Sequence, residues 1–171
     1  FISEHLGTFP HKNLVVSELE YRKNPLYGLN QLPSFLRPFP DEFQFEMKLL
    51  KTMLNNWLEN SLYVDPRAER WVLDAIQTYL MIKYVEVNYG DLKLLGKVSD
   101  FFIVKSFYLS KMKFNDQYPF LFMLMQRKNL DQSLNTPADS LIKFNEKIAN
   151  KYKAGIGLRY LNDYLEHEYV E

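Results

Sequence analysis

Two stretches decide the fold, Lys51-Thr52-Met53-Leu54-Asn55 and Trp71-Val72-Leu73-Asp74-Ala75. Each lies on a predicted helix, the first from Asp41 to about Tyr63 and the second from Asp65-Pro66 to about Gly90. Apolar residues recur along both segments at helical spacing, which predicts one buried face on each helix. Aspartate is a good helix cap, and proline is tolerated in the first turn because its missing N–H has no partner there. The centre of the chain is therefore predicted to be a helical pair.

After this helical pair the sequence predicts further helices, and before it the sequence predicts an N-terminal segment that is mostly not helical. Residues 1–40 combine a short helical or irregular start, a strand over 13–20 and a turn-rich, proline-rich stretch. Downstream, the helical predictions cover 91–97, 100–114, 117–130, 136–150 and 151–166. The predicted fold class is mainly α, with one or two strands near the N-terminus. We expect a single domain over 1–171, made of the N-terminal segment and a helical part over 41–171.

Composition limits the function classes. The chain has 171 residues, enough for one domain with a real core. Lys plus Arg equal Asp plus Glu at 21 each, so no overall field attracts nucleic acid, and we expect no nucleic-acid partner. No apolar run reaches the roughly 20 residues of a spanning helix, so we expect no membrane partner. The first residue is Phe1 rather than methionine, which suggests a piece of a longer protein.

Residue chemistry alone points to no active site. The chain has no cysteine and three histidines, His5, His11 and His167. The last begins a stretch like the zinc motif HExxH, but Glu171 stands where the second histidine belongs. All three histidines are expected to be surface residues. No phosphate-binding loop, GxSxG elbow or catalytic triad is apparent.

The central stretches nevertheless carry a resemblance. Asp74 follows Asn55 after 18 intervening residues, and Tyr79-Leu80 follow Trp71–Ala75. This resembles the gluzincin aminopeptidases, the aminopeptidase N family of zinc metallopeptidases, in which a third zinc ligand, glutamate, follows HExxH at that interval in a WLNEG-like phrase. The resemblance implies the helical core of a thermolysin-like catalytic domain. It also places Lys51–Asn55 in the HExxH slot.

Two flanking phrases support the same resemblance. Gly28-Leu29-Asn30-Gln31-Leu32 resembles the family's GxMEN loop, with Gln31 in the slot of the glutamate that anchors the substrate amine. Tyr152-Lys153-Ala154-Gly155 resembles the YEKG phrase, whose tyrosine stabilises the oxyanion. Tyr152 is therefore the one family catalytic position retained, although a tyrosine at a helix start more often packs than reacts.

The departures from the family pattern affect every catalytic function. Zinc takes imidazole, carboxylate or thiolate ligands at about 2.0–2.3 Å, whereas the ligand positions here hold Lys51, Asn55 and Asp74. Thr52 replaces the glutamate that acts as general base, and Gln31 lacks the charge that pairs with an ammonium group. The degenerate site is expected to hold no zinc and no other cofactor.

We expect Lys51 and Asp74 to form an ion pair with Asn55 hydrogen-bonded nearby, in the space that zinc occupies in the family. The alternative is that these residues are surface positions without a shared role. Two function classes follow. The first is an inactive pseudoenzyme with a hydrolase fold, serving as a scaffold or binding a peptide or protein in the former cleft, beside other domains of the parent chain. The second is an enzyme, either a zinc metallopeptidase with ligands from elsewhere, such as His5 or His11, or a different hydrolase.

Overall fold

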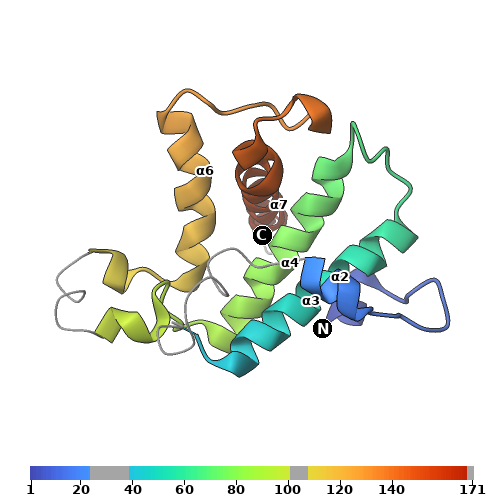
Figure 1. Cartoon of the computed structure of the whole chain (residues 1–171), viewed down its shortest axis with the longest axis horizontal. Helices are drawn as coiled ribbons and strands as arrows, with labels where there is room; N and C mark the ends of the chain where they lie inside the picture. The colour runs from blue at the N-terminus through green and yellow to red at the C-terminus, as the bar shows by residue number, and fades with distance from the viewer. Residues whose placement is uncertain (24–38, 101–107, 169–171) are drawn as a thin grey trace. The chain divides into compact units, whose positions relative to one another are not determined.

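The computed structural model describes residues 1–23, 39–100 and 108–168, and within them the chain is mainly helical. Figure 1 shows the helices along the chain. The chain divides into two compact units. Unit 1 contains Phe1–Leu62 and Tyr84–Asp116, and unit 2 contains Tyr63–Lys83 and Gln117–Glu171. Helix α4, Arg70–Tyr89, contributes its first residues to unit 2 and its last residues to unit 1.

Unit 1 is built on helix α3, Asp41–Ser61, which confirms the first predicted helix. The predicted apolar stripe is buried and includes Phe43, Met47, Leu50, Leu54, Trp57 and Leu58. Phe43 is the centre of an aromatic cluster, with ring centroids 5.4 Å from Phe39, 4.8 Å from Tyr89 and 5.1 Å from Phe114. The edge-to-face geometry of the last two pairs is the arrangement that aromatic quadrupoles favour. The helix begins after Pro40, and the expected cap residue Asp41 is its first residue.

A carboxylate joins α3 to the end of α4 within unit 1. The hydroxyl groups of Tyr84 and Tyr89 both donate to Oε2 of Glu46, Tyr84 at 2.9 Å. Burial and the hydrogen bond to Glu46 raise the pKa of Tyr84 to about 12. Because the carboxylate stabilises the neutral phenol, both tyrosines remain hydrogen-bond donors at neutral pH.

The N-terminal segment differs from its prediction. Helix α1, Ile2–Leu6, agrees with the expected short helical or irregular start. It ends at Gly7, whose φ is 77°. The strand expected over 13–20 is not confirmed, because residues 13–17 are irregular and Glu18–Lys23 forms helix α2. Ser17 Oγ accepts from the Glu20 amide, and the Glu20 carboxylate accepts from the Ser17 amide. This capping box starts a helix and outweighs the β propensity of the preceding valines.

The remainder of unit 1 is made of 3₁₀ turns rather than the predicted helices. In place of a helix over 91–97 there is a turn, an isolated antiparallel bridge between Lys93 and Lys113, and the 3₁₀ segment η2, Gly96–Asp100. The Leu94 amide donates to the Met112 carbonyl and the Phe114 amide donates to the Leu92 carbonyl, both at 2.8 Å, so this stretch pairs with a distant segment. Residues 101–107 of the predicted helix over 100–114 lie outside the described ranges. Its described end forms η3, Tyr108–Lys111, and then η4, Phe114–Asp116.

Unit 2 combines the first part of α4 with α6, Gln117–Arg127, and α7, Asn150–Glu168. The prediction over 117–130 is confirmed by α6 and the last predicted helix by α7. Helix α4 begins at Arg70, after a turn over 66–69, and not at Pro66 as predicted. The helix expected over 136–150 forms in its second half, where residues 143–144 are α-helical and the π-helix η6, Asn145–Ala149, leads directly into α7. Its first half forms only the 3₁₀ turn η5, Ala138–Ser140. Leu141 is extended, so it separates the two halves.

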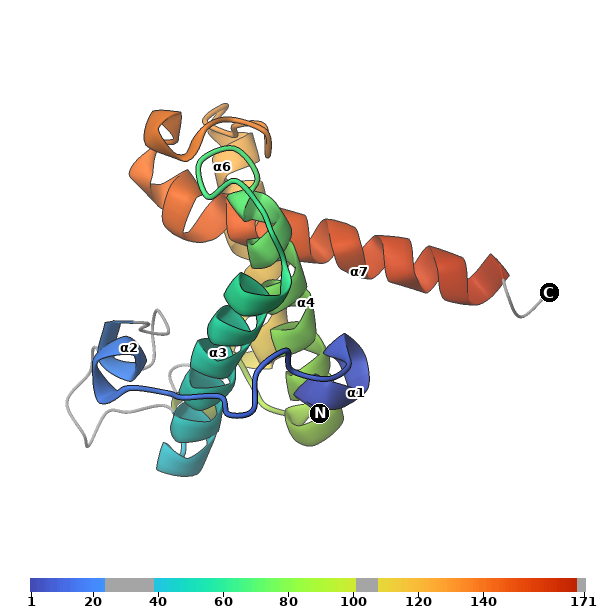
Figure 2. The same cartoon turned by 90° about the vertical axis from the view of Figure 1, so that its right-hand side faces the viewer.

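Helices α4 and α7 approach closely at a glycine. A Cβ atom placed on Gly155 would lie 2.5 Å from Cβ and Cγ2 of Thr78. Two residues later, Gly157 has nothing within 4 Å of such an atom. From there α7 continues as a helix to Glu168 (Figure 2). Its exposed side chains include Tyr160, Leu161, Tyr164 and Leu165. No helix in the described part of the chain has the length and apolarity needed to cross a membrane.

We predict opposite effects for alanine at these two glycines. Gly155→Ala should lower the free energy of unfolding by about 1–3 kcal/mol, because the new methyl group overlaps Thr78. Gly157→Ala should raise it by up to about 1 kcal/mol, because alanine is the better helix former and no atom obstructs it. Urea unfolding monitored by circular dichroism measures both effects. Equal stability of Gly155→Ala and the parent chain would contradict the close packing.

Candidate functional site

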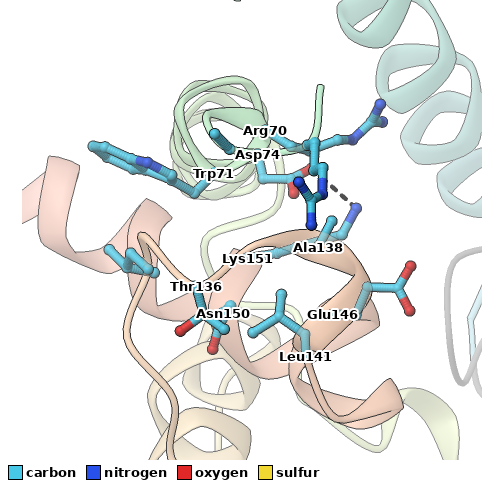
Figure 3. Close-up of a pocket in the computed structure, with 12 residues that line it drawn as sticks. Arg70, Trp71, Asp74, Thr136, Ala138, Leu141, Glu146, Asn150 and Lys151 are labelled. Carbon is cyan, nitrogen blue, oxygen red and sulfur yellow. Dashed lines mark hydrogen bonds and ion pairs between the residues drawn. The ribbon is translucent and has the colours of Figure 1, made fainter. Parts of the chain in front are cut away.

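Unit 2 contains a small pocket, named here the Trp71 pocket, with a volume of about 80 Å³. Its walls come from the turn before α4, the first turns of α4, the segment between α6 and η6, and the junction of η6 with α7 (Figure 3). The described residues that line it are Arg67, Ala68, Arg70, Trp71, Asp74, Leu134, Thr136, Ala138, Leu141, Glu146, Asn150 and Lys151. The lining therefore mixes three cations, two carboxylates, two amide or hydroxyl side chains and an apolar wall.

Asp74 is the buried acid of this pocket. It is 8% exposed, and its Oδ1 accepts a hydrogen bond from Lys151 Nζ at 2.9 Å. Asp74 lies on α4 and Lys151 on the first turn of α7, so the ion pair joins the two helices (Figure 3). A buried carboxylate needs a partner of this kind, because leaving it unpaired in a low-dielectric interior is costly.

A second ion pair closes the outer side of the pocket. Arg67 donates from Nε and Nη2 to Oδ2 of Asp139, at 3.1 and 2.9 Å. The hydrogen bond raises the pKa of Arg67 and lowers that of Asp139. The Ala138 amide also donates to the Arg67 carbonyl at 3.0 Å. These contacts attach η5 to the turn before α4, although both charged groups remain well exposed to water.

Two asparagines at the start of the final helix are buried. Asn145 donates from Nδ2 to the Leu130 carbonyl and to Gln132 Oε1, both at 2.8 Å, which holds the segment after α6 in place. Asn150 lines the pocket, is 6% exposed and donates to the Ser133 carbonyl at 3.4 Å. Its Oδ1 has no hydrogen-bond partner among the described residues. A buried acceptor left unpaired costs about 1–3 kcal/mol.

Tyr152, the retained family tyrosine, lies outside the described lining of the pocket. Its ring packs against that of Tyr118 on α6, with centroids 4.6 Å apart and an interplanar angle of 68°. Tyr118 is buried, and burial raises its pKa well above the usual value. The described contact is thus one of packing between α6 and α7, and a chemical role for Tyr152 stays a prediction.

The other predicted site residues are divided between the units. Lys51, Thr52 and Asn55 lie on α3 in unit 1, whereas Asp74 belongs to unit 2, so the expected ion pair between Lys51 and Asp74 stays a prediction. Thr52 is 1% exposed and donates to the Lys48 carbonyl of its own helix at 2.8 Å. Gln31 and its loop fall outside the described residues.

The histidines form no metal cluster in the part of the chain that the structure describes. His5 shares a hydrogen bond with the Phe1 carbonyl, and His11 packs against Phe9. The side chain of His167 lies outside the described set. Within that set, no three His, Cys, Asp or Glu side chains are grouped so that they could hold a metal ion.

The residues at the expected zinc positions do not fit that metal. Lys51 presents an ammonium group and Asn55 a neutral amide, neither of which is a usual zinc ligand. Asp74 is the only carboxylate of the three, and its Oδ1 already accepts from Lys151. A zinc ion there would have to displace this ammonium group. No step of any reaction is therefore derived through zinc.

Comparison with known proteins finds no matching family and no similar curated protein or solved structure. Sequence reasoning selected Asp74 but missed its partner Lys151 and the pocket residues Arg67 and Asn150. The sequence predicts a helix start at Asp65-Pro66 and another at 135–139. Only the tertiary structure shows that these two segments contact each other.

A double-mutant cycle tests the partner of Asp74. We predict that Asp74→Asn and Lys151→Met are coupled by about 0.5–3 kcal/mol in the free energy of unfolding, because the pair is in contact and mostly buried. The exposed pair Arg159 and Asp163, 3.8 Å apart, is the matched control and should give at most about 0.5 kcal/mol.

The same cycle with Lys51→Met in place of Lys151→Met tests the ion pair expected from sequence. Coupling to Lys51 and none to Lys151 would contradict the described pairing of Asp74.

Proposed function

We propose that this chain is a non-catalytic, aminopeptidase-like domain of a longer protein that binds a peptide or protein segment through the Trp71 pocket. One observation carries the proposal. The carboxylate in the slot of the third zinc ligand, Asp74, is buried in an ion pair with Lys151 on the pocket wall. A carboxylate held in this way contributes to the structure of a binding surface and is poorly placed to bind a metal.

The pocket lining supports binding over catalysis. Among its described residues there is no histidine, serine, cysteine or tyrosine, so the usual pairing of a nucleophile with a general base is missing from that set. Thr136 is the only hydroxyl in it. By contrast, the lining includes Trp71, which is 38% exposed, and the apolar side chains of Leu134 and Leu141. Exposed aromatic rings beside mixed polar groups are common where proteins bind other chains.

Zinc content and peptidase activity test the absence of catalysis. The protein, purified without chelator and then supplemented with zinc, should hold far less than one zinc per chain and release no product from a panel of amino-acid anilides. Zinc is measured by atomic emission and turnover by absorbance. Stoichiometric zinc with turnover would contradict the proposal and favour a metallopeptidase whose ligands come from elsewhere, with His5 and His11 the first residues to replace.

Rebuilding the motif tests the family resemblance separately. The variant Lys51→His, Thr52→Glu, Asn55→His and Asp74→Glu restores HExxH and its distant glutamate. If the chain keeps the family frame, this variant should bind about one zinc per chain, because three ligands then converge. The control carries the same changes but keeps Asn55, and it should bind zinc far more weakly. A rebuilt variant that is folded by circular dichroism but takes up no more zinc than the control would contradict the resemblance.

A further inference from the structure

We infer that helix α7 pairs with α7 of a second copy of this chain, antiparallel and related by a two-fold axis midway between Leu161 and Tyr164. This pairing uses residues outside the described lining of the Trp71 pocket and goes beyond the proposed peptide binding. Three features of the second half of α7 lead to it, namely an exposed apolar stripe, the symmetric spacing of that stripe and the order of charges along the helix.

The second half of α7 presents an apolar stripe to solvent. Four side chains, each between 42% and 72% exposed, form it: Tyr160, Leu161, Tyr164 and Leu165. Positions three and four apart are neighbours on a helix surface, so these side chains are continuous over about two turns. Gly157 lies one turn earlier, and a Cβ atom there would have nothing within 4 Å. A narrow stripe beside a glycine, which permits the close approach of another backbone, fits a second helix.

The spacing of the stripe is symmetric about its centre. Leu161 and Tyr164 lie equally far from the midpoint, and so do Tyr160 and Leu165. An antiparallel second copy therefore places Leu161 of each helix level with Tyr164 of the other, so that each leucine packs against a ring. The other two side chains flank these central layers. Such a contact is isologous, because the same surface serves both copies, and it closes without a third partner.

The charges along α7 select the antiparallel orientation. Residues 150–159 contain lysine and arginine but no acid, whereas residues 160–168 contain Asp163, Glu166 and Glu168 but no lysine or arginine. The helix macrodipole favours the opposite order, so the helix alone does not account for it. Two parallel copies would place these acids side by side. In the antiparallel pair the two Glu166 residues are about 10 Å apart along the axis, roughly a Debye length, and each comes level with Arg159 of the other copy.

The exposed area sets the strength of the pair. From their exposures and the usual areas of such side chains, the four residues of the stripe bury roughly 500–900 Å² over both copies. Stable interfaces bury about 1,200–2,000 Å², and smaller ones belong to transient complexes. We therefore expect a dimer that forms and dissociates with protein concentration.

Sedimentation velocity on the full chain tests the pairing. The sedimentation coefficient should rise from that of a monomer towards that of a dimer between about 1 μM and about 1 mM. The double variant Leu161→Glu and Tyr164→Glu should stay monomeric over this range, because it adds acids to the centre of the contact. Both side chains are exposed, so circular dichroism should show an unchanged helix content.

The matched control changes two apolar residues of α6 that are exposed to a similar extent, Phe120→Glu and Met123→Glu. It should dimerise as the parent chain does. A parent chain that is monomeric at the highest concentration would overturn the inference. Association of the α7 variant equal to that of the parent, or loss of association in the control alone, would overturn the assignment to α7.

Disulfide cross-linking tests the orientation, and each cross-link is assignable because the chain has no cysteine of its own. Leu161→Cys carrying an affinity tag is mixed with untagged Tyr164→Cys and oxidised. The antiparallel pair should give at least about fivefold more mixed cross-links than cross-links within one variant, since only the mixed pair brings the two positions level, within the roughly 4–7 Å between Cα atoms that a disulfide spans. An excess of cross-links within each variant indicates parallel helices and would overturn the two-fold arrangement.

Discussion

The approach of α4 to α7 is the contact on which unit 2 depends. Two interactions make it, the ion pair of Asp74 with Lys151 and the packing of Thr78 against Gly155. Asp74 and Thr78 are four residues apart on α4, and Lys151 and Gly155 are four residues apart on α7, so successive turns of the same two helix faces meet. The glycine allows the backbones to come close, and the ion pair satisfies the charges that this closeness buries. Neither interaction would form well without the other.

The pocket follows from this contact. Because α4 and α7 meet at Asp74 and Lys151, the segment between α6 and η6 has to cover the ends of both helices. Asn145 holds that segment through Gln132 and the Leu130 carbonyl, and Arg67 holds η5 through Asp139. The segment leaves a small space bordered by charged groups and one indole ring. Paired charges at the wall of a partly enclosed space interact more strongly with a ligand than the same groups in open solvent.

The core of unit 1 is held together by packed aromatic rings, whereas an ion pair joins α4 to α7 in unit 2. Phe39, Phe43, Tyr89 and Phe114 form one cluster, and Glu46 accepts from two tyrosine hydroxyls at its side. The high share of phenylalanine and tyrosine in the chain is explained in part by this core, since large rings bury much area per residue. Three of the positions that the family resemblance assigns to zinc chemistry, Lys51, Thr52 and Asn55, lie on the same helix α3. There Thr52 donates to its own helix.

The sequence alone determined the helices that have a long apolar period, α3, α4, α6 and α7, because a buried face requires that spacing wherever the helix packs. It also determined the chemistry that is missing at the zinc positions, since residue identity decides which atoms can bind a metal. The sequence also contains the capping box of Ser17 and Glu20, but the β-branched residues before it favoured a strand. Only the tertiary structure decided that Asp74 pairs with Lys151, that Asn145 and Asn150 are buried, and that the helix expected over 136–150 is interrupted at Leu141. These outcomes depend on contacts between residues far apart in the chain, and local propensity carries no information about which distant partner satisfies a buried polar group.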